Sequence, residues 1–383
     1  MLVVNAGSSS LKLRLLEVGG HDADDADLDA AHDAAQVIEQ ADLPAPDEAG
    51  SHDLEQVLAE WPAPTAVGHR VVHGGSEFTG PVLLDASVRA QLDRLSDLAP
   101  LHQPKSLAAL DATAAVLPQV PAVACFDTAF HAGMPAAAAT YAVPARWRSD
   151  YAIRRYGFHG LSHAYAAGRA AAIVGRPLTQ LRVVTCHLGA GASLCAVRGG
   201  RSVDTTMGFT PLEGLVMATR SGSVDPGLVL WLEEHERLAP AEVAEALERR
   251  SGLAALAGTP DMREVEARVA AGDPDARLAL DVYLHRLVGA IASMAAACAG
   301  LDVLVFTGGV GEHSAQVRSA AAAQLGWLGV AVDAEHNEAA GSDAGADVDV
   351  TAGSAGARVR TLVVHAREDL QIARETYRLL AGS

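Results

Sequence analysis

The chain has 383 residues, half of them apolar, which is enough for two domains with substantial cores. Its formal net charge of −18 argues against a nucleic-acid partner, because duplex binding needs a basic surface. The four cysteines show no CxxC spacing, and the uncharged apolar runs are shorter than a membrane span. We therefore expect a soluble, cytoplasmic protein without a membrane partner.

The first predicted element is a strand pair at residues 2–4 and 11–18, joined by the turn Asn5-Ala6-Gly7-Ser8-Ser9-Ser10. Such a turn is either a polar hairpin or a cradle for phosphate. Gly7 would allow close approach of the backbone, and Lys12 would add a positive charge. The turn alone favours the hairpin. Residues 20–60 lack a clear period and are expected to form a variable surface region with some helix.

The segment AVGHRVVHGG at residues 66–75 predicts a strand that ends in a glycine turn. Side chains alternate along a strand, so His69, Val71 and His73 should share one face, with Arg70 and Val72 on the other. An arginine beside a valine suits a small carboxylate ligand, whose oxygens the guanidinium can bind in pairs. A structural salt bridge of Arg70 is the competing interpretation.

Further along, the pattern predicts a helix at 106–117 and a strand at 121–131 that carries Asp127 at its carboxyl end. Apolar periodicity fades around 143–157, where we expect a domain boundary. The second half should open with a helix capped near Ser162.

Three strands are then expected within 181–206, with glycine turns at 189–191 and 199–200. The pattern of residues 301–326 predicts a strand, a glycine turn and a helix. Residues 334–358 are expected to form a loop, and residues 367–380 a closing amphipathic helix. The segments 2–16 and 182–197 share one plan, an apolar strand, a small-residue turn and a second strand, which suggests an internal duplication.

Three further positions suggest chemistry, each with a structural alternative. His159 precedes Gly160 and is by itself most simply a packed histidine at a helix start. Arg220 lies in a loop rich in glycine, serine and proline, which favours a ligand clamp over a core position, with loop-stabilising hydrogen bonds as the alternative. The segment FTGGVGEHS at 306–314 does not match the GxGxxG fingerprint, yet a glycine turn before a helix suits a nucleotide as well as a tight connection.

Taken in chain order, these motifs resemble the acetate kinase family over nearly the whole chain. The matching segments are NAGSSSLKL, GHRVVHGG, FDTAFHAGMP, RRYGFHGLSH, CHLGAGAS, DTTMGFTPLEGLVMATRSGSVDPG, FTGGVGEHS and REDLQIA. The resemblance implies an α/β fold of two duplicated actin-like ATPase (ribonuclease H-like) domains flanking a nucleotide cleft. The first domain would be residues 1–147, completed by the C-terminal helix 366–383, and the second 148–365. The family also implies a homodimer.

The implied activity is reversible transfer of a phosphoryl group from ATP to acetate by direct in-line attack, which gives ADP and acetyl phosphate. ATP/ADP and Mg²⁺, with Mn²⁺ as a substitute, would be the cofactors. By resemblance, the catalytic residues are Asp127, His159 and Arg220. The acetate pocket would comprise Arg70, Val72, Leu101, Phe158 and Pro211, and the metal would be associated with Asn5 and Glu368. The nucleotide would meet Ser8, Ser10, Lys12, His187, Leu188, Gly189, Ala190, Gly191, Asp261, Met262, Arg263, Gly309, Val310, Gly311, Glu312 and His313.

The sequence departs from the family pattern in its phosphate loop, which reads HLGAG where HLGNG is usual, so that Ala190 replaces an amide side chain. Ser223, His313 and Arg367 are lesser departures. The alternatives are a propionate or butyrate kinase of the same family, a non-catalytic nucleotide-binding protein of the actin or chaperone type, and an inactive homologue. In a non-catalytic protein, Arg70, Arg220 and His159 would have no clear purpose.

Overall fold

The computed structural model describes residues 1–7, 10–18, 35–44, 51–96, 103–341, 346–353 and 356–382. The chain divides into two compact units. Unit 1 comprises Met1–Ala132, Gly160–Tyr165 and Arg367–Ser383, and unit 2 comprises Gly133–His159 and Ala166–Ala366. The boundaries proposed from the sequence, at residues 147 and 365, stay a prediction.

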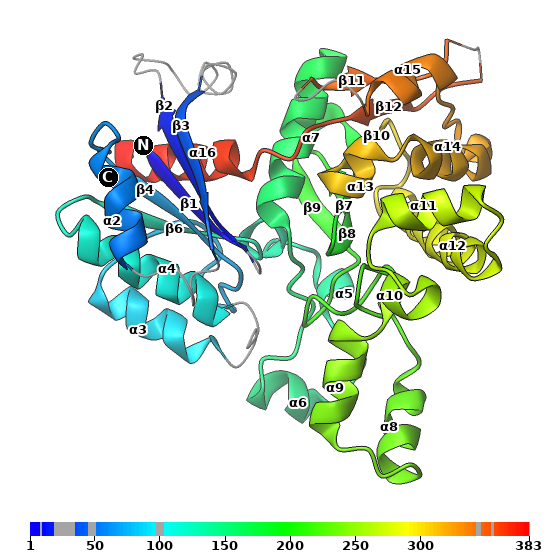
Figure 1. Cartoon of the computed structure of the whole chain (residues 1–383), viewed down its shortest axis with the longest axis horizontal. Helices are drawn as coiled ribbons and strands as arrows, with labels where there is room; N and C mark the ends of the chain where they lie inside the picture. The colour runs from blue at the N-terminus through cyan, green and yellow to red at the C-terminus, as the bar shows by residue number, and fades with distance from the viewer. Residues whose placement is uncertain are drawn as a thin grey trace. The chain divides into compact units, whose positions relative to one another are not determined.

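Unit 1 is built on a six-stranded mixed sheet with the order β3-β2-β1-β4-β6-β5 (Figure 1). Its strands are β1 (Leu2–Ala6), β2 (Leu11–Glu17), β3 (Gln36–Leu43), β4 (Val67–Val71), β5 (Val82–Leu83) and β6 (Ala122–Phe126). The first three strands form an antiparallel meander, while β4 runs parallel to β1 and β6 runs parallel to β4. The expected strand pair at the N-terminus is thus confirmed. The strand expected at 121–131 is confirmed over Ala122–Phe126, whereas Ala129–His131 form a 3₁₀ turn.

Helices cover both faces of this sheet (Figure 1). They are α2 (Ser51–Ala59), α3 (Ala86–Arg94), α4 (Gln103–Val116) and α16 (Glu368–Ala381), with a short 3₁₀ turn at Ala129–His131. Leu2, Val4 and Val67 face the core that contains α2 and α4, whereas Val3 faces the core with Ile372 of α16. The alternation expected of a strand therefore sorts side chains between two cores.

Unit 2 contains a second six-stranded mixed sheet, with the order β11-β12-β10-β7-β8-β9. Its strands are β7 (Arg182–Leu188), β8 (Ala192–Arg198), β9 (Arg201–Thr205), β10 (Val303–Thr307), β11 (Val348–Asp349) and β12 (Arg360–Val363). Again a three-stranded antiparallel meander is followed by two parallel strands and one antiparallel strand at the edge. Because the two sheets share this topology, the predicted α/β fold of two duplicated domains is confirmed.

The remaining helices belong mainly to unit 2. They are α5 (Ala136–Ala139), α6 (Ala145–Asp150), α7 (Gly160–Val174), α8 (Pro226–Glu234), α9 (Pro240–Arg249), α10 (Gly252–Ala257), α11 (Met262–Ala270), α12 (Pro274–Ala297), α13 (Gly308–His313), α14 (Ala315–Gln324) and α15 (Ala334–Ala339), with 3₁₀ turns at Leu178–Gln180 and Gly326–Leu328. In length and composition α12 would suffice to cross a membrane. It packs instead along β7, β8 and β9 as a core helix.

Four local expectations were wrong. The region 20–60 contains the expected helix as α2, but residues 36–43 form the edge strand β3. All side chains of β3 are at least partly exposed, so the apolar alternation that marks a strand is missing. Ser162 does not cap α7, because it lies buried inside the helix, which begins after His159. The glycines at 308–311 are themselves helical, within α13. The expected loop at 334–358 contains α15 and β11.

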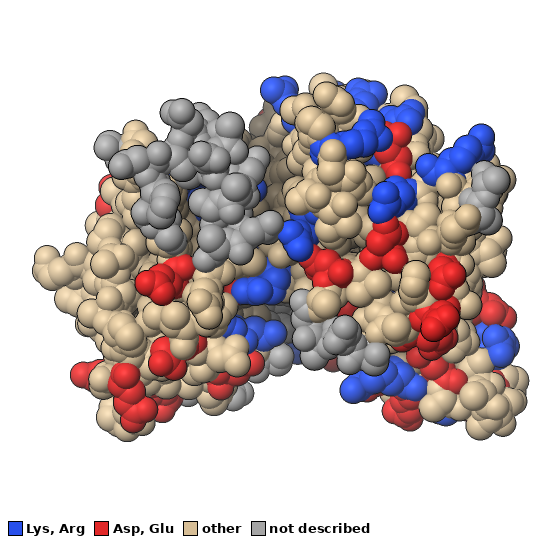
Figure 2. All heavy atoms as spheres, turned by 90° about the horizontal axis from the view of Figure 1, so that it is seen from above, with Lys and Arg blue, Asp and Glu red and all other residues tan. Residues whose placement is uncertain are grey.

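The surface carries both signs of charge. In the view of Figure 2, acidic and basic side chains are interspersed over the described part of the molecule. The net charge remains strongly negative at −18.

Candidate active site

A polar cluster in unit 1 lies where parallel strands end. We call Asn5, Arg70, Asp127 and Glu368 the unit 1 cluster. Asn5 lies near the end of β1, Arg70 near the end of β4, and Asp127 directly follows β6. The N-terminus of α16 supplies Glu368. Carboxyl ends of parallel strands are where α/β proteins gather binding groups, which explains how residues 363 positions apart come together.

Arg70 is held in a two-pronged ion pair. Its Nη2 donates to Oδ2 of Asp127 at 2.6 Å, and its Nε donates to Oδ1 at 3.1 Å. Its Nη1 donates to Oδ1 of Asn5 at 3.2 Å. A guanidinium carries five N–H groups, so three are engaged and two make no hydrogen bond to the described residues. Arg70 is thereby fixed in orientation yet keeps donors for an anion.

Asn5 links the arginine to the second carboxylate. Its Nδ2 donates to Oε2 of Glu368 at 2.9 Å, while its Oδ1 accepts from Arg70. Nε of Arg70 lies 3.8 Å from Oε2 of Glu368. These partners define which way the amide of Asn5 points, because only its nitrogen can donate to a carboxylate. In the β1–β2 pairing, Lys12 lies opposite Asn5 and so shares this sheet face.

Burial shapes the electrostatics of the unit 1 cluster. Burial opposes the charge on Arg70, but the carboxylates of Asp127 and Glu368 raise its pKa, so the guanidinium stays protonated. Burial raises the pKa of Asp127, and the charge of Arg70 works against that rise. The bidentate contact is the geometry of a guanidinium with an ionised carboxylate.

A second cluster, in unit 2, centres on His159. We call His159, His187, Ser193 and Arg220 the unit 2 cluster. His159 adopts a left-handed backbone conformation with φ of 57° immediately before α7. Its Nδ1 lies 2.9 Å from Oγ of Ser193, and its ring stacks on that of His187 with centroids 4.4 Å apart. His187 and Ser193 are themselves paired across β7 and β8. The hairpin therefore fixes the imidazole of His159 from two sides.

Arg220 reaches the same hairpin. A Cβ placed on Gly191 would lie 3.4 Å from Nη1 of Arg220 and 3.5 Å from Nε2 of His159, so both side chains border this glycine. Nη1 of Arg220 also donates to the carbonyl of Pro211 at 3.3 Å. Burial lowers the pKa of Arg220, and Glu248 only partly offsets the effect. A partly buried guanidinium with weak carboxylate compensation favours an incoming anion.

The two glycine-containing segments of unit 2, the β7–β8 turn and the start of α13, are closely packed. In the β7–β8 turn the amide of Gly189 donates to the carbonyl of Gly191 at 3.0 Å, and Ala190 between them is exposed. Gly308 has φ of 78°, and a Cβ there would come within 2.9 Å of the Leu188 carbonyl. A side chain at 308 would therefore push the β7 end and α13 apart.

Glu312 anchors α13. Its Oε1 accepts from the amides of Gly308 at 2.8 Å and Ala366 at 3.0 Å, and its Oε2 lies 2.6 Å from Nδ1 of His365. Since the carboxylate is buried within these contacts, its role in the described structure is to hold the helix. Sequence reasoning did not single out His365, nor Ser193 beside His159. The register of β7 and β8 brings Ser193 there, and no sequence motif marks it.

The other predicted residues are placed as follows. Asp261 caps α11 and forms an exposed ion pair with Arg263 at 2.6 Å, while Met262 between them is buried. Val72 belongs to unit 1, and Phe158 and Pro211 belong to unit 2. The carbonyl of Ser10 accepts from the Gly7 amide. Ser8 and Leu101 lie outside the described residues.

The side chains of the unit 1 cluster are chemically suited to bind a hard divalent cation. It offers carboxylate oxygens of Asp127 and Glu368 and the amide oxygen of Asn5, which are the ligand types that Mg²⁺ prefers. Two carboxylates are enough, since Mg²⁺ usually completes its shell with water and phosphate oxygens. Among the described residues there is no group of three or more His, Cys, Asp or Glu that could hold a metal.

Comparisons with known proteins cover the whole chain. Residues 1–374 match the model of the acetokinase family. The chain is 44% identical to an acetate kinase of Deinococcus deserti, over all of this chain and 98% of the relative. Crystal structures of Porphyromonas gingivalis acetate kinase and of a propionate kinase from Francisella tularensis superpose with TM-scores of 0.86 and 0.85, each at 33% identity. These matches cover 99% and 98% of both chains, respectively.

Proposed function

The chain belongs to the acetokinase family and is a kinase that acts on acetate, and we propose that its two clusters together carry out the transfer of the γ-phosphoryl group of ATP. The reaction is ATP + acetate ⇌ ADP + acetyl phosphate. The observation that carries this assignment of roles is the orientation of Arg70, which Asp127 and Asn5 fix while two N–H groups are left for an anion.

Acetate needs no general base. A carboxylic acid with a pKa near those of Asp and Glu is ionised at neutral pH, so its oxygen is already a nucleophile. The barrier is instead the approach of two anions, the carboxylate and the γ-phosphate. Catalysis therefore depends on positioning and on positive charge around the transferred group.

We assign that charge to two arginines and one histidine. Arg70 would hold the acetate carboxylate through its remaining N–H groups. Arg220 and His159, which both border Gly191, would donate to the equatorial oxygens of the phosphoryl group in flight. Ser193 holds the imidazole of His159 at Nδ1 and so sets the orientation of the ring.

The acidic residues of the unit 1 cluster would orient Arg70 and the metal. Asp127 keeps Arg70 in place and would help orient the metal and its water. A Mg²⁺ ion held by Asn5 and Glu368 beside Asp127 would neutralise phosphate charge when bound. Lys12, on the same sheet face as Asn5, would contact the ATP phosphates together with Ser8 and Ser10.

The nucleotide would be bound mainly by unit 2. We propose that the β7–β8 turn, from His187 to Gly191, lies against the phosphates, since short glycine-containing turns commonly bind anions. Gly309 of α13 leaves room for close approach of the nucleotide, because a Cβ there would meet nothing within 4 Å, and His313 lies at the end of that helix. Asp261 and Arg263 would lie toward the adenosine.

The acyl group would be met by Val72, Phe158 and Pro211, with Leu101 as a further proposed contact. The relatives include both an acetate kinase and a propionate kinase, so chain length is a matter of degree. One methylene is worth about 1–3 kcal/mol in such a pocket, which permits overlap between C2 and C3 acids. We further propose that the protein is a cytoplasmic homodimer. Light scattering would measure its mass in solution.

The test is to measure kcat/KM for acetate, propionate and butyrate at saturating ATP and Mg²⁺. We expect acetate to be preferred, with propionate about tenfold weaker or more. A higher kcat/KM for propionate or butyrate would assign the chain to a sibling activity. A non-catalytic nucleotide-binding protein would turn over none of the three acids.

A further inference from the structure

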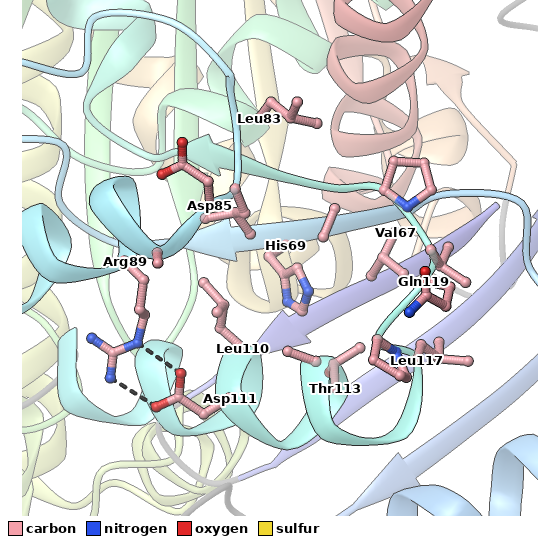
Figure 3. A pocket seen from close by; sticks show the side chains of 17 residues that line it. Val67, His69, Leu83, Asp85, Arg89, Leu110, Asp111, Thr113, Leu117 and Gln119 are labelled. Carbon is pink, nitrogen blue, oxygen red and sulfur yellow. Dashed lines mark hydrogen bonds and ion pairs between the residues drawn. The ribbon is translucent and has the colours of Figure 1, made fainter.

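Unit 1 contains a cavity that the proposed phosphoryl transfer does not use (Figure 3). It has a volume of about 580 Å³, within the range of roughly 300–1,000 Å³ typical of small-molecule sites. It lies between the sheet strands β4, β5 and β6 and the helices α3 and α4. Its walls are largely apolar, formed by Val67, Leu83, Leu84, Leu110, Leu117 and Val120.

His69 extends from β4 into this cavity (Figure 3). Only 2% of the residue is exposed, and its imidazole makes no hydrogen bond to the described residues. Its ring nitrogens can take a hydrogen bond from whatever fills the cavity, because a neutral imidazole has one donor and one acceptor. A ligand atom in the cavity would supply the missing hydrogen bond.

Most other polar side chains around the cavity are already engaged, and Gln119 is exposed at the surface. Arg89 binds both oxygens of Asp111 at 2.7 Å, as the dashed lines in Figure 3 mark. Asp85 accepts from the amide of Val88 at 2.7 Å, and Thr113 donates to the carbonyl of Ala109 at 2.7 Å. Within the cavity, His69 is thus the buried polar side chain left to recognise a ligand.

Charge selects the class of ligand. Burial lowers the pKa of His69 to about 4, so the imidazole is neutral at pH 7 and can either donate or accept. The charged residues lining the cavity are Asp85, Asp111 and Arg89, which sum to one net negative charge. An anion would meet repulsion without a free cation to bind, so substrates such as acetate or ATP do not fit here.

We propose that this cavity is a second binding site, which takes an uncharged, mainly apolar small molecule whose single hydroxyl or carbonyl group hydrogen-bonds to His69. Because neighbouring strand residues face opposite ways, Arg70 points to the other side of the sheet, toward Asp127. The site is therefore separate from the unit 1 cluster, and its ligand will not compete with acetate.

The probe is 2-naphthol, an uncharged aromatic alcohol, and binding is measured by calorimetry on the full chain at pH 7. Ala114 and Ala115 are both exposed on α4, but only Ala114 lines the cavity. We expect Ala114→Trp to weaken 2-naphthol binding at least tenfold by filling the opening, and Ala115→Trp to leave it unchanged. Equal affinities for the two variants, or no binding by the unaltered protein, would overturn the proposal.

The hydrogen bond is tested with naphthalene, which lacks the hydroxyl. The unaltered protein should prefer 2-naphthol over naphthalene by about threefold to tenfold, the size of one hydrogen bond. His69→Phe keeps an aromatic ring and should abolish that preference. Independently of this variant, 2-naphthol should shift the NMR signals of the His69 ring, and saturating acetate should not displace the probe. Displacement by acetate, or an unmoved His69 signal, would count against the site.

Discussion

The amide of Gly160 donates a hydrogen bond of 2.8 Å to the carbonyl of Asp127. A Cβ on Gly160 would lie only 2.2 Å from that oxygen and 3.0 Å from Cβ of Phe130. Gly160 also follows His159 directly and begins α7. Gly160 therefore fixes the backbone of Asp127, a proposed catalytic residue, and directly follows His159, a second one.

From this contact we predict that Gly160→Ala displaces Asp127. The clash should cost about 1–3 kcal/mol of unfolding free energy, as overpacking of a closed site does. It should also lower kcat, because the ion pair with Arg70 would shift. Gly133→Ala is the matched control, since a Cβ there meets nothing within 4 Å. Thermal unfolding and steady-state assays that failed to distinguish the two variants would refute the positional role of Gly160.

Arg220→Ala should lower kcat by about 10²–10⁴, the range found when a transition-state donor is removed. The thermal unfolding midpoint should change little, because burial already lowers the pKa of this guanidinium and its removal relieves a desolvation cost. Arg198→Ala on the exposed end of β8 serves as the control. A loss of less than threefold in kcat for Arg220→Ala would remove this residue from the reaction.

Ala190→Asn should strengthen nucleotide binding. The residue is exposed at the tip of the β7–β8 turn, so an asparagine fits without a clash, and it restores the amide that the family pattern has there. One added hydrogen bond to a phosphate predicts a KM for ATP lower by about threefold to tenfold. The KM for acetate should not move. An unchanged or higher KM for ATP would show that the phosphates do not reach this side chain.

Stability should fall as the pH drops from about 6.5 toward 4. Burial lowers the pKa of both His69 and His73 to about 4 in the folded state. The unfolded chain then binds more protons in this window, so acid favours unfolding. Each histidine should contribute up to about 3 kcal/mol of that loss. Denaturant titrations at pH 7 and pH 4.5 should show a smaller loss for His69→Phe, and an equal loss would contradict this account.

Much of the fold could be predicted because its strands have clear patterns. The β1–β2 and β7–β8 hairpins are apolar runs interrupted by small residues, and alternation in β4 correctly separated His69 from Arg70. The edge strand β3 has no buried side chain, so nothing in its pattern distinguished it from a loop. Its place in the sheet depends on antiparallel pairing with β2.

The candidate site was predictable in its residues but not in its contacts. The sequence indicated Arg70 and Asp127 separately, whereas their bidentate pairing depends on β4 and β6 lying side by side. The left-handed backbone of His159 is uncommon for a residue other than glycine and has no sequence signal. The cavity beside His69 depends on the spacing between α4 and the sheet, which no local pattern encodes.

The central claim is that this chain transfers a phosphoryl group from ATP to acetate and that Arg70 and Arg220 supply the positive charge for this transfer. The most direct measurement traps the product with hydroxylamine and follows acetyl hydroxamate formation by the purified chain. We predict formation that requires ATP, acetate and Mg²⁺ together and that falls by at least 10² in both Arg70→Ala and Arg220→Ala. No hydroxamate from the unaltered protein, or undiminished rates in both arginine variants, would contradict it.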